Sequence, residues 1–182
     1  GDAATLLATL PAGLVDTCLT SPPYWGQRAY DNADGFGQEP DPEAYVTRLV
    51  EVGREIRRVL KPEGSLWLNL GDTYRRKRLQ GIPWRVALAL QDEGWILRNA
   101  VVWDKEKGNP CHASDKLRNV HELIFHLVRQ ERYRYDLDAI RQPPGQATVR
   151  DGRITTPTGV NGVRYERQIR RSPALSDQER AR

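Results

Sequence analysis

The sequence contains no methionine, only two cysteines and no long apolar run. The last two shortages each exclude a class of protein. Cys18 and Cys111 lie far apart and neither has a Cys-x-x-Cys partner, which excludes a disulfide framework or a zinc cluster and favours the reducing cytoplasm. The three histidines are scattered without ligand spacing, so we expect no metal site. No stretch approaches the roughly 20 apolar residues of a membrane helix, and no secretory signal pattern opens the chain. The lack of a methionine even at position 1 predicts a fragment of a longer protein.

Charge is unevenly distributed along the chain. Residues 129–182 hold 12 Lys/Arg against 7 Asp/Glu, and residues 1–128 hold 16 against 17, which together give the net charge of +4. A basic end on a near-neutral body indicates a polyanionic partner for that end, or else a solvated tail. From residue 143 onward the chain is rich in Gly, Pro, Thr and Arg, which is typical of a loop region.

Hydrophobic periodicity predicts alternating strands and helices over the first 142 residues. We expect helices over 2–11, 41–64 and 82–94, strands over 15–19, 65–70, 95–103 and 122–129, and an alternating edge segment over 132–140. The best-defined helix has an Asp41 cap, Pro42 in its first turn and an apolar stripe at three- and four-residue spacing: Val46, Leu49, Val52, Ile56 and Val59. This order predicts an α/β fold with a mainly parallel sheet, whose sites form at the carboxyl ends of the strands.

The segment "TSPPYW" follows the first predicted strand and stops it abruptly. Pro22 and Pro23 fix the backbone and remove two N–H donors, so the neighbouring carbonyls cannot continue sheet pairing. Ser21 adds a hydroxyl beside them and Tyr24 adds a flat ring. With no strong nucleophile nearby, this corner suits a reaction in which an exocyclic amine is held still and a planar heterocycle is stacked.

The corner resembles the catalytic motif of the amino-directed DNA methyltransferases, which has the form Ser/Asp/Asn-Pro-Pro-Tyr/Phe. Ser21, Pro22, Pro23 and Tyr24 match it, and a serine at the first position is similar to the cytosine-N4 enzymes rather than the adenine-N6 enzymes. The resemblance continues, in the family's order, through "VLKPEGSLWLNLGDTY", "GIPWRVALALQDEGWILRNAVVWDK" and "RNVHELIFHLVRQERYRYDLDAIRQP". It implies a Rossmann-like fold with a mainly parallel sheet and helices on both faces. Residues 1–142 would be the catalytic half and residues 143–182 the start of the target-recognition region.

One family motif is missing. The Phe-x-Gly-x-Gly loop of the cofactor half has no counterpart, because "DGFGQEP" follows no suitable strand. The resemblance therefore implies a partial methyltransferase fold. Three function hypotheses stay open: a cytosine-N4 enzyme, the same fold acting on adenine N6 or on RNA, and a non-catalytic DNA-binding remnant.

The resemblance also implies ligands and site residues. S-adenosylmethionine would be the methyl donor, approached by Asp2 and Asp72, although either carboxylate could instead cap a helix. Double-stranded DNA would be the partner, and its target base would be flipped out and stacked on Tyr24. This stacking needs the tyrosine ring and not its hydroxyl. Candidate DNA contacts, each with the alternative of plain packing or solvation, are Trp25, Arg75, Arg76, Lys77, Arg78 and Arg118. Trp67, Trp95 and Trp103 are predicted to be core residues.

Overall fold

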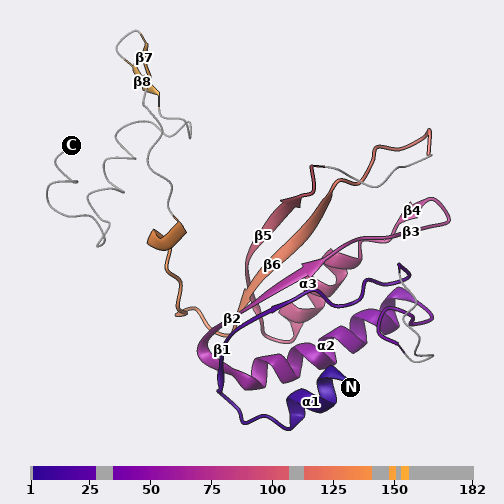
Figure 1. Cartoon of the computed structure of the whole chain (residues 1–182), viewed down its shortest axis with the longest axis vertical. Helices are drawn as coiled ribbons and strands as arrows, with labels where there is room; N and C mark the ends of the chain where they lie inside the picture. Colours follow the sequence, from indigo (N-terminus) through magenta and orange to yellow (C-terminus); the bar gives the residue numbers. More distant parts are fainter. Residues whose placement is uncertain (1, 28–34, 107–112, 141–147, 151–152, 156–182) are drawn as a thin grey trace, which may run out of the picture. The chain divides into compact units, whose positions relative to one another are not determined.

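The computed structural model describes residues 2–27, 35–106, 113–140, 148–150 and 153–155 (Figure 1). The chain forms two compact units, residues 1–134 and 135–182. The second unit contains a short 3₁₀ helix, η1 (Asp138–Ile140), and an antiparallel pair, β7 (Thr148–Arg150) and β8 (Arg153–Thr155). Cys111, His112 and most of the predicted 143–182 segment lie outside the described residues. No described helix is long and apolar enough to cross a membrane.

A four-stranded sheet organises the first unit. Its strands are β1 (Val15–Thr20), β2 (Leu60–Leu70), β5 (Ile96–Asp104) and β6 (His121–Val128), in the order β1-β2-β6-β5. β1 pairs with β2 in parallel, whereas β6 is antiparallel to both β2 and β5. Three strands therefore run in one direction, and the reversed β6 brings its amino end to the edge where β1 and β2 end.

The long helices α2 (Pro42–Val59) and α3 (Ile82–Asp92) cover one face of this sheet and contact each other (Figure 1). We expected helices on both faces of the sheet. Within the described residues, α2 and α3 cover one face, and no described helix covers the other. The crossovers β1-α2-β2 and β2-α3-β5 advance in the same direction across the sheet, and right-handed crossovers of that kind place their helices on the same side. Within the described residues, the two long helices thus lie on the same face of the sheet.

Local signals in the sequence explain the helix bounds. Asp41 caps α2 by accepting from the Ala44 backbone N–H at 2.7 Å, and Asp2 caps the short helix α1 (Ala3–Ala8) by accepting from Thr5 at 2.9 Å. The apolar side of α2 packs against alternate residues of β2. Buried residues that form this core are Tyr45, Leu49, Val50, Ile56, Leu66, Leu68 and Leu70 from α2 and β2, and Ile82, Val86, Ala87 and Leu90 from α3.

Two predictions about strands are wrong. Residues 132–140 form no strand: Tyr133 packs edge-on against His126 at 5.5 Å, and the segment continues into η1. Trp103 is 55% exposed and is not a core residue, because β5 carries it on the face that no described helix covers. Trp67 lies on that face as well, stacked on His126 at 4.1 Å, whereas Trp95 is buried as predicted.

Candidate active site at the Ser-Pro-Pro-Tyr corner

The Ser-Pro-Pro-Tyr corner lies at the carboxyl end of β1, and its two proline carbonyls have different surroundings. The Pro23 carbonyl accepts a hydrogen bond of 3.0 Å from the Tyr45 hydroxyl, whose ring is fully buried in the core. Among the described residues, none donates to the Pro22 carbonyl. One carbonyl is therefore held by the core, while the other stays available as an acceptor beside Ser21.

Tyr24 is fixed at both ends of its side chain. Its ring lies against the backbone of Gly71, directly after β2, and its hydroxyl reaches the first residues of β6. That hydroxyl donates to Glu122 Oε2 at 2.9 Å and accepts from Asn69 Nδ2 at 3.0 Å and from the Ser21 hydroxyl at 3.1 Å. The Tyr24 ring is thus a rigid, partly exposed platform at the edge of the sheet.

Glu122 lies at the end of this network, and sequence reasoning assigned it no role. Its Oε2 also accepts from Asn69 at 2.9 Å, and its Oε1 forms an ion pair with Lys105. Burial by itself would raise the pKa of Glu122, but the contacts with Lys105, Asn69 and Tyr24 outweigh it, so the pKa lies below the ordinary value. Burial raises the pKa of Tyr24 to about 12, and the neighbouring carboxylate adds to the rise. Glu122 is therefore a carboxylate and Tyr24 a phenol at neutral pH.

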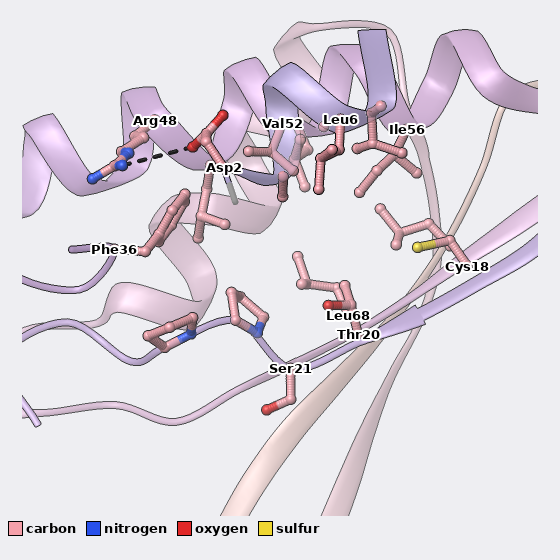
Figure 2. A pocket seen from close by; sticks show the side chains of 18 of the residues that line it. Asp2, Leu6, Cys18, Thr20, Ser21, Phe36, Arg48, Val52, Ile56 and Leu68 are labelled. Carbon is pink, nitrogen blue, oxygen red and sulfur yellow. Dashed lines mark ion pairs between the residues drawn. The ribbon is translucent and has the colours of Figure 1, made fainter. Parts of the chain in front are cut away.

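A cavity of about 1290 Å³ opens on the helix side of the corner, between β1 and the helices α1 and α2. Figure 2 shows apolar side chains such as Leu6, Val52 and Ile56 on one wall, and Ser21 at the rim with its hydroxyl directed away from them. Asp2 also lies at the rim, where it pairs with Arg48 at 3.8 Å. The cavity is therefore lined both by the Asp2 carboxylate and by Pro22 and Pro23 of the corner.

Asp72 has the surroundings of a capping residue. Its carboxylate accepts from three backbone N–H groups, those of Thr73 at 2.8 Å, Gly81 at 3.0 Å and Ile82 at 3.1 Å, and so holds the loop before α3. It does not line the cavity described above. Asp72 therefore has the contacts of a cap, whereas Asp2 is the predicted cofactor residue that lines the cavity.

Trp25 is packed inside the first unit. Its indole is 4% exposed, its Nε1 donates to the Glu39 carbonyl at 2.9 Å, and Arg75 covers its ring at 5.3 Å. A side chain this enclosed has no surface to offer DNA, so the packing alternative holds for Trp25 and we remove it from the candidate DNA contacts.

The basic residues 75–78 form an exposed hairpin that follows β2, the strand that pairs with β1. β3 (Tyr74–Arg75) and β4 (Arg78–Leu79) pair around Arg76 and Lys77, both of which have a positive φ, at 50° and 65°. The loop 113–120 lies against this hairpin: Lys77 pairs with Asp115 at 2.8 Å and Lys116 lies 4.2 Å from the Tyr74 ring (Figure 1). Within the described ranges, Arg76, Arg78 and Arg118 have no ion pair. Two basic segments that are distant in sequence are brought together here.

Solved structures place this fold among the methyltransferases. The cytosine-N4-specific PvuII DNA methyltransferase superposes with a TM-score of 0.66 at 20% identity, over 77% of this chain and 51% of that one. TTHA0409 from Thermus thermophilus, a provisionally assigned DNA modification methylase solved with S-adenosyl-L-methionine, superposes with a TM-score of 0.58 at 27% identity, over 76% and 55%. The described residues thus form part of an S-adenosylmethionine-dependent methyltransferase fold.

The particular family follows from the sequence comparison. The profile of the DNA methylase family, which comprises N6 and N4 methyltransferases, matches residues 15–170, and the chain belongs to this family. Type II methyltransferase M.SfiI of Streptomyces fimbriatus is 42% identical over 160 residues, which cover 79% of this chain and 38% of the relative. Type II methyltransferase M.XycI of Xanthomonas campestris pv. cyanopsidis is 37% identical over 182 residues, which cover 84% and 61%. The chain therefore spans about two fifths to three fifths of the length of these relatives.

Proposed function

We propose that this chain is the catalytic part of a Type II DNA methyltransferase that transfers a methyl group to the N4 amine of a flipped cytosine in double-stranded DNA. The observation that carries the proposal is the pair of acceptors at the corner, the Ser21 hydroxyl and the Pro22 carbonyl. Ser21 donates its own proton to Tyr24, so its lone pairs are available to a substrate N–H. Relatives named as Type II methyltransferases support a role in a restriction–modification system.

The two acceptors address the main chemical difficulty of the reaction. An exocyclic base amine is a weak nucleophile because its lone pair is delocalised into the ring. Hydrogen bonds from both N–H groups, one to Ser21 and one to Pro22, would draw the nitrogen toward a tetrahedral geometry and free that lone pair. S-adenosylmethionine, when bound, supplies the activated methyl group. The chain itself contributes positioning and electrostatic stabilisation, which are worth most in a site closed to water.

The Tyr24 ring would hold the target base outside the duplex. A base inside the helix cannot reach the corner, so it must be extruded at a cost of a few kcal/mol. Stacking on an aromatic ring returns about 1–3 kcal/mol per base. Because Gly71 and the Glu122 network hold the ring in place before substrate arrives, little further ordering is needed on binding.

The cavity beside the corner fits part of the methyl donor. Asp2 would accept from the donor's hydroxyl or ammonium groups, and the proline corner would border the transferred methyl group. The described residues offer no glycine-rich phosphate or ribose loop, in keeping with a chain that spans only part of its relatives' length. We therefore expect the rest of the parent protein to supply the remainder of this site.

Methylation of duplex DNA by the full-length parent protein tests the proposal. Digestion to nucleosides and mass spectrometry should detect N4-methylcytosine, and Ser21→Ala should slow single-turnover transfer while leaving DNA affinity nearly unchanged. Detection of N6-methyladenine would instead favour the adenine alternative. Duplex binding without any methyl transfer would favour the DNA-binding remnant and overturn the enzymatic proposal.

A further inference from the structure

We propose that Glu122 is the terminal proton acceptor of a relay that runs from the substrate amine through Ser21 and Tyr24. The proposal rests on the function proposed above and assigns its proton-transfer step. It starts from the chain of three oxygens, Ser21 Oγ, Tyr24 Oη and Glu122 Oε2, which are joined by contacts of 3.1 and 2.9 Å.

The direction of these hydrogen bonds follows from the chemistry of the end group. A carboxylate can only accept, so the phenol proton of Tyr24 must point to Glu122. The Tyr24 oxygen is then left with acceptor capacity only, and it accepts from Asn69 and from Ser21. Ser21 must therefore donate toward Tyr24, and its oxygen presents lone pairs to the substrate. Glu122 thus orients a hydroxyl that it does not touch.

The same chain can remove the proton that the reaction releases. As the amine nitrogen forms its bond to the methyl carbon, the carbon–sulfur bond of the sulfonium donor would break and the sulfur would keep the electron pair as a neutral thioether. The positive charge would then lie on the amine, which must lose one of its protons. That N–H bond breaks as the proton moves to Ser21 Oγ, the Ser21 proton moves to Tyr24 Oη, and the Tyr24 proton moves to Glu122 Oε2. The amine leaves neutral and the carboxylate becomes a carboxylic acid, which returns its proton to solvent. No electrons are gained or lost in this step.

Lys105 and Asn69 keep Glu122 ready to accept. Lys105 pairs with Oε1 and Asn69 donates to Oε2, and both contacts stabilise the charged form. The titratable groups in contact with Glu122 are Lys105, after β5, and Tyr24, after β1; β2 contributes only the neutral amide of Asn69. The next pair along the strands, Asp104 and His121, projects from the opposite face of the sheet.

A purely structural role for Glu122 makes different predictions. If the Glu122 carboxylate only held Tyr24 in place, its replacement would lower the stability of the protein, but it would impose no pH dependence on the chemical step. Glutamine keeps the shape and the hydrogen-bond acceptor of glutamate but cannot take up a proton at neutral pH. Glu122→Gln therefore separates the two roles, and Lys105→Met tests the relay without altering any of its three oxygens.

The test uses the full-length parent protein in single-turnover methyl transfer between pH 4.5 and 8, with folding followed by circular dichroism. We expect Glu122→Gln to slow transfer by about 100-fold at pH 7.5, as for loss of a general base. In Lys105→Met the unpaired carboxylate should take up a proton more readily, so its rate should begin to fall at a higher pH than in wild type. Glu131→Gln, an exposed carboxylate outside the network, is the control and should match wild type at every pH.

A second measurement is independent of turnover. Tyrosine labelled at ¹³Cζ should show a resonance, identified by its loss in Tyr24→Phe, that titrates above the ordinary tyrosine range, and Glu122→Gln should lower the pKa of that group. An active wild type with Glu122→Gln at the wild-type rate, or with an unchanged pH profile in Lys105→Met, would overturn the relay alone. If Glu122→Gln does not fold, the Lys105→Met profile decides. No methyl transfer by wild type would overturn the proposed function and the relay with it.

Discussion

The ring of Tyr24 packs against Gly71 with no space for a side chain between them. A Cβ added at position 71 would stand 2.6 Å from Cε2 and 2.7 Å from Cδ2 of that ring. Both values are well inside van der Waals contact, so any larger residue must displace the tyrosine. The backbone of Gly71 does not adopt a positive φ. Glycine is therefore needed here for the close approach of the Tyr24 ring and not for its backbone conformation.

Gly71→Ala should therefore disable the corner while the sheet still folds. We expect a loss of about 1–3 kcal/mol in the free energy of unfolding from overpacking, and a large fall in single-turnover methyl transfer by the parent protein. Urea unfolding checks the first value. In a double-mutant cycle, Gly71→Ala combined with Tyr24→Ala should be less destabilised than the sum of the two, because removal of the ring relieves the clash. Strict additivity would contradict the contact.

Two substitutions at Tyr24 should separate its ring from its hydroxyl. Tyr24→Ala removes the stacking platform, so a fluorescent reporter base at the target position should spend less time outside the duplex. Tyr24→Phe keeps the platform and should leave that signal close to wild type. It also breaks the link between Ser21 and Glu122, so methyl transfer should still slow by about 100-fold, the lower end of the range for loss of proton-transfer assistance. Equal base extrusion in both variants would refute the stacking role.

The exposed basic hairpin should contribute affinity without sequence preference. Replacing Arg76, Arg78 and Arg118 by alanine in the parent protein should weaken binding to all duplexes alike. The slope of log K against log salt should fall by about 0.9 for each lost phosphate contact. Lys61→Ala is the control, since Lys61 lies near the amino end of β2, whereas the hairpin follows the carboxyl end of that strand. A change in sequence preference, or an unchanged slope, would exclude this surface as a phosphate contact.

Binding of the methyl donor should require more than this chain. Calorimetric titration of the 182 residues with S-adenosylmethionine should show weak binding or none, because Asp2 and the proline corner form only one side of the proposed site. The full-length parent protein should bind it measurably under the same conditions. Micromolar binding to the isolated chain would mean that the cavity between α1, α2 and β1 holds the whole donor.

Local patterns in the sequence were sufficient for much of the fold and for the corner itself. Asp41, Pro42 and the apolar stripe identified α2 within a few residues, and the two prolines marked the end of β1 because their constraints are local. Trp103 was misassigned because an apolar strand was taken to be covered on both faces. Asp72 shows a different difficulty. From sequence alone, a carboxylate at the end of a strand can be a helix cap or a ligand-binding group, and only its backbone partners distinguish the two roles.

The Tyr24–Glu122 contact could not be predicted because its partners are 98 residues apart in sequence. Reasoning from parallel strands directs attention to residues that follow a strand, whereas Glu122 is the second residue of β6. The sequence predicted a mainly parallel sheet, and the antiparallel β6 brings a side chain to the site that this prediction did not include. In a mixed sheet, a polar residue near the start of a reversed strand is as strong a candidate as one that follows a parallel strand.

The antiparallel placement of β6 has a consequence for how this protein can vary. The position of Glu122 is set by the pairing of β6 with β2, from Leu70–Leu123 to Ser65–Val128, and not by the length of the loop that precedes it. Insertions or deletions between β5 and β6 should therefore be tolerated at the reaction centre while altering the surface beside the basic hairpin. A gene library randomised in length and composition over residues 107–118 could then alter DNA contacts while the chemistry stays constant.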